Sequence, residues 1–508
     1  MFQQSTYRKM ALAVAATLFT GTFAMASDEH SFSPYLGASH KMQENTLTQR
    51  APGVPRLGPH ATERLLYWTN IAMDANALDA TPNGEGIPVH TPGQQAGPTR
   101  STRAMAIVTV AMFEAVNTVM GGYQSYVGYL GAPKKTSVDA AIAQAAHDTL
   151  VALYPSQSAI FGAALTADLA NVVTRVAAQK TDGIDLGRRA AAAVLAARSN
   201  DNIQVGEQII GVSYFPGTNP GDWNKDPIAQ HAVALGALSG STKPFVIRSG
   251  AQFRVPAPPA LSSTTYASAF NEVKTVGAKG DATSPTTRTA DQTIAGGFWG
   301  YEGTPKLGTP ARLYTQVAIQ VAEQMGTYNT NDLARLLAMA SAAMYDAGIA
   351  TWESKYAYKH WRPIQAVRAA DLDGNAATAV QANWEPMGAV ASNTTGPNFT
   401  PPFPAYPSGH AVFGAALFQT LRNVYGTDDV EFSLVSDEYN GVTKDNQGNI
   451  RPALVRTYNS FTEAENENGQ SRVYIGVHWQ YDISSAHTQG HQVADYVYRR
   501  AFRRTELR

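Results

Sequence analysis

The sequence of 508 residues predicts an all-α fold of two related helical bundles. Long stretches place apolar residues at helical spacing, and alternating strand patterns are nearly absent. A Gly- and Pro-rich connection over about 211–263 separates two helical halves. The halves also resemble each other: "RAMAIVTVAMFEA" at 103–115 and "RLLAMASAAMYDA" at 335–347 share Arg, Ala, Ala-Met, an aromatic residue, an acid and Ala at the same offsets. An old duplication explains this match, and the alternative is chance similarity between two Ala-rich buried helices.

The stretches with the helical pattern define the predicted elements. They lie at 61–77, 100–120, 138–153, 158–178, 184–199, 309–325, 331–356, 411–425 and 482–502. The first five fall in an N-terminal helical half, predicted over 27–250, and the last four in a C-terminal half over 251–508.

Residues 1–26 have the pattern of an export signal rather than of a folded element. Two basic residues, Arg8 and Lys9, precede an apolar run, and Ala24-Met25-Ala26 provides a small-residue cleavage pattern. The sequence therefore predicts a mature protein that is secreted or periplasmic, with no membrane segment. A retained N-terminal membrane anchor is the alternative, although the run is short and rich in Ala, Thr and Gly.

Composition excludes several classes of ligand and site. The formal net charge of -1 gives no overall attraction to nucleic acid, and we expect no nucleic-acid partner. The absence of cysteine excludes disulfides, thiolate metal sites and a cysteine nucleophile. Any charged ligand must therefore be recognised by a local group of residues.

The stretch "FPAYPSGHAVFGAALF" at 403–418 places a Pro-rich approach and Ser-Gly-His in front of an apolar helical pattern. Ser408 is a favoured residue just before a helix, and Pro407 restricts the backbone that enters it. The free N–H groups of a helix start bind anions, and His410 beside such an anion is placed for proton transfer. Taken alone, the same residues also fit an ordinary turn in which His410 is a cap residue.

Two further groups of polar residues occur in the second half. "KYAYKHWRP" contains Lys355 and Arg362, and "SRVYIGVHWQYD" contains Arg472, His478 and Asp482. If the last stretch is helical, His478 and Asp482 share a face, and the carboxylate holds one imidazole nitrogen while the other points into the site.

Together these residues favour an oxyanion over a metal ion. One Lys, two Arg, two His and a Ser-Gly helix start form a poor site for Zn²⁺, Ca²⁺ or Mg²⁺, because these ions prefer several neutral or anionic ligands. The same set suits a tetrahedral oxyanion, since Arg donates in a planar fork and Lys supplies a point charge. The C-terminal bundle is therefore predicted to carry an oxyanion site.

The three blocks Lys-x6-Arg-Pro, Pro-Ser-Gly-His and Ser-Arg-x5-His-x3-Asp, in this order over 355–482, resemble a known superfamily. It comprises the type 2 phosphatidic acid phosphatases and the vanadium-dependent haloperoxidases. The resemblance implies that His410 is the acid/base and that His478, supported by Asp482, takes the axial position and binds the metal in vanadate. It also implies that the oxyanion is held by Lys355, Arg362, Ser408, Gly409, Arg472 and His478.

The motifs are shared by two chemistries, and both remain open at this point. In a haloperoxidase, His478 holds the vanadate cofactor, Lys355 polarises hydrogen peroxide, and a halide is oxidised to hypohalous acid that can modify a small organic acceptor. In a secreted acid phosphatase, His478 attacks phosphorus to give a phosphohistidine, and His410 protonates the leaving oxygen. A catalytically silent oxyanion-binding protein is the third possibility.

Features outside the motifs favour the haloperoxidases and their chloroperoxidase-like branch. The length and the duplicated helical halves are typical of that branch, whereas soluble phosphatases are shorter. Trp352 and Phe403 fall where chloroperoxidases place aromatic residues beside vanadate. "RTADQTIAGGFWGYEG" resembles a chloroperoxidase segment whose acid, here Asp291, pairs with the motif arginine, here Arg472.

Other candidate sites are weaker. His487 and His491 are four residues apart on a predicted helix, but no third metal ligand is evident. "DLDGN" at Asp371 begins like a calcium loop, yet Ala382 stands where the bidentate Glu is needed. His147, in the first half, lacks Lys and Arg partners and is interpreted as structural.

Overall fold

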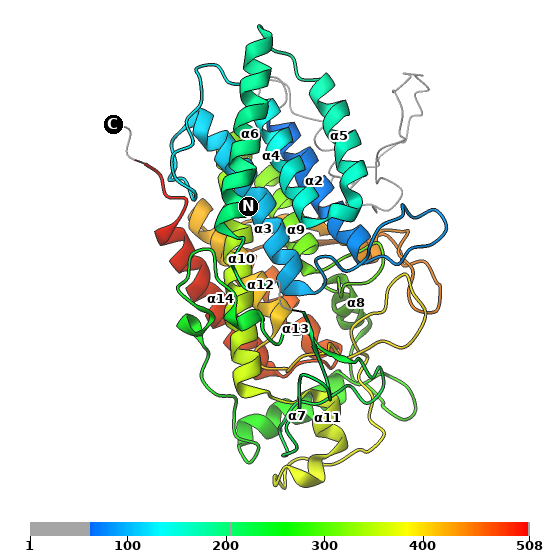
Figure 1. The fold of residues 1–508 in the computed structure, drawn as a ribbon. Helices are drawn as coiled ribbons and strands as arrows, with labels where there is room; N and C mark the ends of the chain where they lie inside the picture. The colour runs from blue at the N-terminus through cyan, green and yellow to red at the C-terminus, as the bar shows by residue number, and fades with distance from the viewer. Residues whose placement is uncertain (1–60, 204–205, 506–508) are drawn as a thin grey trace, which may run out of the picture. The chain divides into compact units, whose positions relative to one another are not determined.

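The computed structural model describes residues 61–203 and 206–505, so the predicted export signal lies outside the described residues. The fold is built mainly from α-helices (Figure 1). The described helices are α2 (Ala61–Asp79), α3 (Pro98–Met120), α4 (Val138–Leu153), α5 (Ser158–Ala170), α6 (Ala177–Ala197), α7 (Thr264–Val276), α8 (Ala290–Phe298), α9 (Pro310–Gln324), α10 (Thr330–Tyr358), α11 (Pro363–Arg368), α12 (Gly409–Tyr425), α13 (Phe461–Tyr474) and α14 (Gln480–Arg500).

Strands are few in this part of the chain, and they form two small antiparallel sheets. The strand pairs are β1 (Gln208–Ile209) with β2 (Val233–Ala234), and β3 (Phe432–Val435) with β4 (Val455–Tyr458). In the second sheet, Phe432 lies opposite Tyr458. The prediction of an all-α fold is confirmed.

Each predicted helix corresponds to an observed one, with ends that shift by a few residues. The largest shifts are that α5 ends at Ala170 and that α6 begins at Ala177. The pattern does not reveal α7, α8, α11 and α13. The helix α11 has only six residues, and α13 reads "FTEAENENGQSRVY", which is too polar to show an apolar stripe. The connection expected over 211–263 contains β2 and short 3-10 turns but no α-helix.

The two sequence repeats lie on α3 and α10, which pack against each other (Figure 1). The acid of each repeat holds a neighbouring loop. Glu114 accepts hydrogen bonds from the Ser125 hydroxyl and from the backbone N–H of Tyr126. Asp346 accepts hydrogen bonds from the three backbone N–H groups of residues 245–247. The repeated acids are therefore structural, because each fixes a loop onto its helix.

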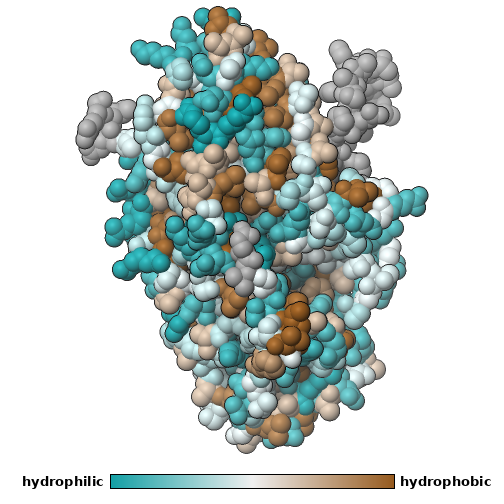
Figure 2. Space-filling view, in the orientation of Figure 1, coloured by the Kyte–Doolittle hydropathy of each residue, from teal (hydrophilic) through white to brown (hydrophobic). Residues whose placement is uncertain are grey.

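The described residues belong to a single compact unit with one large apolar core. The helix α10 packs against α3, α12 and α14. Both α3 and α10 are long and apolar enough to cross a membrane, but 83% and 94% of their apolar windows are buried inside the protein. On the face shown in Figure 2, apolar residues are exposed in small groups among polar ones. The predicted division between residues 250 and 251 stays a prediction.

Close packing brings the ends of several helices together where α12 begins. Gly490 of α14 lies against α12, because a Cβ at this position would be 2.8 Å from the carbonyl oxygen of Val412. The backbone N–H of Ser408 donates to the carbonyl oxygen of Asp482 at 3.1 Å, which joins the starts of α12 and α14. The C-terminal turn of α10, which carries Lys355, completes this region.

Candidate active site

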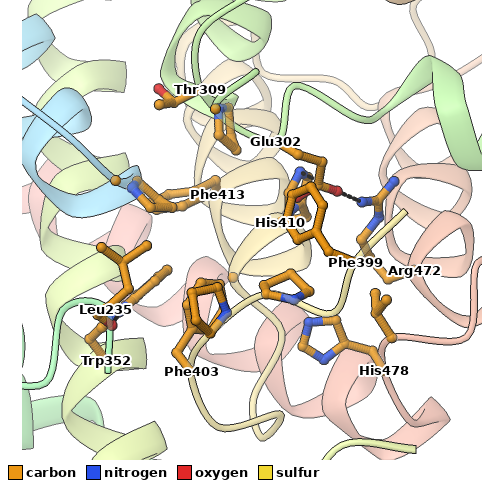
Figure 3. Close-up of a pocket in the computed structure, with 18 of the residues that line it drawn as sticks. Leu235, Glu302, Thr309, Trp352, Phe399, Phe403, His410, Phe413, Arg472 and His478 are labelled. Atoms are coloured by element: carbon orange, nitrogen blue, oxygen red, sulfur yellow. Dashed lines mark hydrogen bonds and ion pairs between the residues drawn. The ribbon is translucent and has the colours of Figure 1, made fainter. Parts of the chain in front are cut away.

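A cavity of about 210 Å³ lies in front of the N-terminus of α12 (Figure 3). Glu302, His410, Arg472 and His478 are the charged or titratable residues that line it. Most of the other lining residues are apolar, and they include Leu235, Trp352, Phe399, Pro401, Pro402, Phe403 and Phe413. An apolar lining lowers the local dielectric and strengthens every electrostatic interaction within the cavity.

Ser408 caps α12 as the sequence predicts. Its side chain accepts a hydrogen bond from the backbone N–H of Ala411, and the residue is fully buried. Gly409 lies against the ring of Trp352, where a Cβ would come within 3.1 Å of the indole. The small residue therefore lets the first turn approach this aromatic wall. The first N–H groups of a helix lack partners within the helix and favour an anion.

His478 and Asp482 form a hydrogen-bonded pair, with Nδ1 2.7 Å from Oδ2. The pair does not lie along one helical face: His478 precedes α14, Trp479 is its N-cap, and Asp482 also accepts from the backbone N–H of Trp479. On the other side of the ring, Nε2 lies 3.0 Å from Nη1 of Arg362, which is only a donor. In His478, Nδ1 therefore carries the proton and Nε2 presents a lone pair.

Arg362 and Lys355 are buried cations held by backbone carbonyls. Nζ of Lys355 donates to the carbonyl oxygens of Pro404 and Ala405, both at 2.8 Å. Arg362 donates to two further carbonyl oxygens through Nε and Nη1, whereas its buried Nη2 has no hydrogen-bond partner in the described structure. Neither cation has a carboxylate within ion-pair distance among the described residues. Part of their donor capacity thus remains for an anion.

Arg472 is paired with Glu302, whose Oε1 lies 2.5 Å from Nη1. The prediction that Asp291 is the partner of Arg472 is wrong. Asp291 lies in the first turn of α8, its side chain is 71% exposed, and it pairs with Arg456. Glu302 lies in the loop that follows α8, and its Oε1 is also 3.9 Å from Nε2 of His410. Figure 3 shows Glu302 between His410 and Arg472.

His410 is held by a backbone peptide. Its Nε2 lies 2.7 Å from the carbonyl oxygen of Gly300, so Nε2 carries the proton of the neutral ring and Nδ1 is left to accept one. The same peptide unit is fixed on its other side, because the N–H of Tyr301 donates to Oε1 of the buried Glu438 at 3.0 Å. Arg451 donates to the other carboxylate oxygen of Glu438. Glu438 therefore orients the carbonyl that holds His410.

Burial and the neighbouring cations set the charges of the site. The pKa values of His410 and His478 lie well below the ordinary value, because of burial first and of nearby arginines second. Burial also lowers the pKa of Lys355 well below its ordinary value. In contrast, burial raises the pKa of Asp482 to about 7. Both imidazoles are thus neutral at neutral pH, and an anion would balance the charge of the cations.

The donor set fits a tetrahedral oxyanion. No group of three His, Asp or Glu residues that suits a metal ion occurs in the part of the chain that the structure describes. The buried, unpartnered Nη2 of Arg362 is a donor that an oxyanion would satisfy. Lys355, Arg362 and Ser408 are buried next to the cavity and do not line it. The predicted residues that the structure brings together are Lys355, Arg362, Ser408, Gly409, His410, Arg472, His478 and Asp482.

The weaker histidine candidates have structural partners instead. His487 and His491 on α14 face the carboxylate of Glu465, which also forms an ion pair with Arg422. These groups surround one buried carboxylate. His147 is hydrogen-bonded to the residue that follows it, in agreement with the structural interpretation.

Three residues that shape the site were missed from sequence: Gly300, Glu302 and Glu438. The sequence singles out the segment that contains Glu302, but the resemblance points to Asp291 of that segment. Glu302 stands directly before Gly303, in a "GYEG" sequence typical of a loop, which is a weak signal in its favour. Glu438 lies between the second and third motif blocks, and no motif marks it.

This chain is similar to known proteins over most of its length. Residues 335–506 match the family model described as the VCPO second helical-bundle domain. A vanadium chloroperoxidase of Curvularia inaequalis is 28% identical over 522 residues, which cover 86% of this chain and 81% of that protein.

Two solved bacterial structures share the fold. A vanadium-dependent iodoperoxidase has a TM-score of 0.69 at 20% identity, with 88% of this chain and 98% of that chain covered. A vanadium-dependent chloroperoxidase in its holo form has a TM-score of 0.59 at 17% identity, with 84% and 95% covered. The resemblance that the motifs predict is confirmed: this chain is similar to a vanadium chloroperoxidase over most of its length, and its residues 335–506 match a VCPO second helical-bundle domain.

Proposed function

We propose that the protein is a vanadate-dependent haloperoxidase that uses hydrogen peroxide to oxidise a halide to hypohalous acid. The observation that carries the proposal is the buried, neutral ring of His478. Asp482 holds its Nδ1, and its Nε2 lone pair lies beside the Arg362 guanidinium. A neutral imidazole with a fixed tautomer is the form that binds a metal centre, and the surrounding cations suit the charge of vanadate.

The residues present fit vanadate as an oxyanion that takes one nitrogen ligand from the protein. Its oxygens would be held by Lys355, Arg362, Ser408, Gly409 and Arg472, and its metal by Nε2 of His478. Bound vanadate would supply a Lewis-acidic centre that activates peroxide toward a halide.

The chain itself supplies a base, a cation and a dry cavity. Nδ1 of His410 is free to accept a proton from hydrogen peroxide, because Nε2 is engaged by Gly300. The Lys355 ammonium lies 5.1 Å from the ring of Phe403 and stabilises negative charge that develops nearby. Trp352 and Phe403, whose ring centroids are 5.1 Å apart, limit the access of water. A halide and a small organic acceptor would enter through the same apolar cavity.

A secreted acid phosphatase is the second candidate, because the His478–Asp482 pair also suits attack on phosphorus. The two functions are separated by assays on purified protein in phosphate-free buffer. We expect oxidation of chloride, bromide or iodide by peroxide only after vanadate is added, and competition by phosphate. If vanadate only inhibits, and a phosphomonoester forms a phosphoenzyme, the phosphatase is the correct function.

We also propose that the mature protein is secreted or periplasmic, on the basis of the N-terminal pattern over residues 1–26. Fractionation of expressing cells, with N-terminal sequencing of the product, tests this location. A product that starts at Met1 and stays in the cytoplasm would contradict it.

A further inference from the structure

Arg103 and Arg335 begin the two sequence repeats, but they have different partners. Arg103 donates from Nε to the fully buried carboxylate of Asp201 at 2.5 Å. Arg335 donates from Nε to the carbonyl oxygen of Phe502 at 2.6 Å, and no described carboxylate lies within ion-pair distance of its guanidinium. The arginine of the first repeat therefore has an internal anion, Asp201, whereas the arginine of the second repeat has none within ion-pair distance among the described residues.

Arg335 instead lines a cavity of about 590 Å³. This cavity lies near the N-terminal end of α10, whereas Lys355 lies in the last turn of the same helix. The cavity is lined by Tyr123, Thr327, Asp332, Arg335, Val424, Tyr425, Tyr498, Arg499, Arg503 and Arg504. Four of these residues are arginines, and the one acid, Asp332, is hydrogen-bonded to the hydroxyl of Tyr123. The lining therefore carries an excess of positive charge.

Two of the arginines contact the ring of Tyr123 before any ligand binds. The Arg335 guanidinium lies 4.9 Å from the ring centroid of Tyr123 and 5.7 Å from that of Tyr498. The Arg504 guanidinium lies 6.0 Å from the ring centroid of Tyr123, and its backbone forms a bridge with the same residue. Contacts that already position these two guanidinium groups reduce the entropy that they lose on binding.

The half-buried charge of Arg335 has a physical cost that an anion would offset. Burial lowers the pKa of Arg335, and Arg504 lowers it further, whereas Tyr123, Tyr498 and Asp332 oppose these effects. The pKa is lowered on balance, so the charged form is incompletely compensated in this cavity. Buried or partly buried charges are normally paired, so the missing partner points to an external anion.

We propose that this cavity binds a small polyphosphate-class anion, with Arg335 and Arg504 as its principal ligands. Several guanidinium groups match an anion with many terminal oxygens better than a single carboxylate, because each planar fork binds two oxygens. The hydroxyls of Thr327 and Tyr425 are hydrogen-bonded to each other at 2.8 Å, which leaves one O–H as a further donor at the same cavity. This site is separate from the proposed vanadate site. That site, called the oxyanion cage below, is formed by Lys355, Arg362, Ser408, Gly409, Arg472 and His478.

Inorganic pyrophosphate is the probe, measured by titration calorimetry on the full chain at low salt. We expect binding to wild type that weakens about tenfold in Arg335→Gln and in Arg504→Gln, since each loses charge-assisted hydrogen bonds. Pyrophosphate should also raise the thermal midpoint of wild type more than that of either variant. Arg175→Gln, an exposed arginine outside this cavity, removes the same charge and should bind as wild type does.

Two further variants give outcomes that decide the assignment. Arg362→Ala disables the oxyanion cage, and pyrophosphate binding that survives in it supports the separate site. Binding that disappears in Arg362→Ala and keeps its wild-type affinity in Arg504→Gln, a substitution of an exposed side chain, overturns the proposal. A chain without residues 506–508 should bind with unchanged affinity, and a gain of about tenfold or more would show that the chain's own end competes for these arginines.

Discussion

Glu302 accepts a hydrogen bond from Arg472 at 2.5 Å, and the two side chains are only 5% and 1% exposed. Such a pair is costly to break, because removal of one partner leaves a buried charge uncompensated. Burial raises the pKa of Glu302, and Arg472 opposes this effect. The pair therefore fixes the position of Arg472 and balances the charge of the arginine that lines the cavity.

Replacement of Glu302 by Gln should destabilise the vanadate-free protein by about 3 kcal/mol, because Arg472 loses its counter-charge. Vanadate supplies a negative charge at the same place, so it should raise the thermal midpoint more in this variant than in wild type. Asp291→Asn is the matched control, since an exposed pair contributes at most about 1 kcal/mol. Thermal scans with and without vanadate test this, and an equal vanadate shift in all three proteins would contradict it.

Glu438 should affect turnover without affecting vanadate retention. Glu438→Gln weakens the hold on the Gly300–Tyr301 peptide, whose carbonyl orients His410. We expect kcat to fall by about tenfold, because a displaced His410 loses only part of the rate enhancement that a general acid/base contributes. The amount of vanadate that the protein retains should not change. Exposed Glu463 provides a control substitution to Gln with no effect on either quantity. A loss of vanadate that parallels the loss of turnover would show that Glu438 acts only on stability.

The helical fold and most of the site could be predicted because their signals are local in sequence. The helix start after Ser408 follows from capping chemistry, and the motif blocks contain the cations and both histidines. The partner of Arg472 could not be chosen in this way, because the path of the loop after α8 decides whether Asp291 or Glu302 reaches it. The helix α13 was missed for a similar reason, since its burial depends on tertiary packing and not on an apolar stripe.

His360 should make the protein less stable in acid. It is buried, its Nε2 is 2.7 Å from the Tyr481 hydroxyl, and burial lowers its pKa to about 3. The pKa of His360 in the unfolded chain is about 6.5. At pH values between this one and the folded pKa of about 3, the unfolded chain binds a proton that the folded protein does not. Stability therefore falls as pH falls through this range.

The expected slope from His360 is about 1.4 kcal/mol of unfolding free energy per pH unit. His360→Gln keeps a hydrogen-bonding group for Tyr481 and should remove this contribution between pH values of about 4 and 6. At neutral and higher pH, the slopes of the two proteins should coincide. Denaturant titrations across this range test it, and equal slopes in acid would exclude His360 as a source of acid lability.

The motif arginines should matter for their position and not for charge alone. Arg362→Ala and Arg472→Ala each remove a buried guanidinium from the cage and should weaken vanadate binding by about tenfold or more. Lys359→Asn removes an exposed charge and should leave vanadate binding unchanged. Asn suits this position because the backbone there is left-handed, with a φ of 49°. Equilibrium dialysis with vanadate measures all three, and equal losses would mean that only general positive charge attracts the anion.

The two histidines should separate retention of vanadate from turnover. His478→Ala removes the nitrogen that presents a lone pair to the cage, so vanadate should be lost on gel filtration. His410→Ala leaves the cage cations in place, so vanadate should stay bound while turnover falls by about 10²-fold or more. If His478→Ala retains vanadate as wild type does, His478 is not its ligand.

The pKa of His410 should rise when vanadate binds. In the vanadate-free protein, burial and Arg472 hold it well below the ordinary value, and a bound anion cancels part of the repulsion from the cations. Since a protonated His410 cannot accept a proton, halide oxidation should fall as pH drops through this raised pKa. NMR titration of the His410 ring with and without vanadate gives both pKa values, with His410→Ala identifying the signal. A pKa that stays the same or falls on loading would show that His410 does not face the anion, and the assignment of the base would then be wrong.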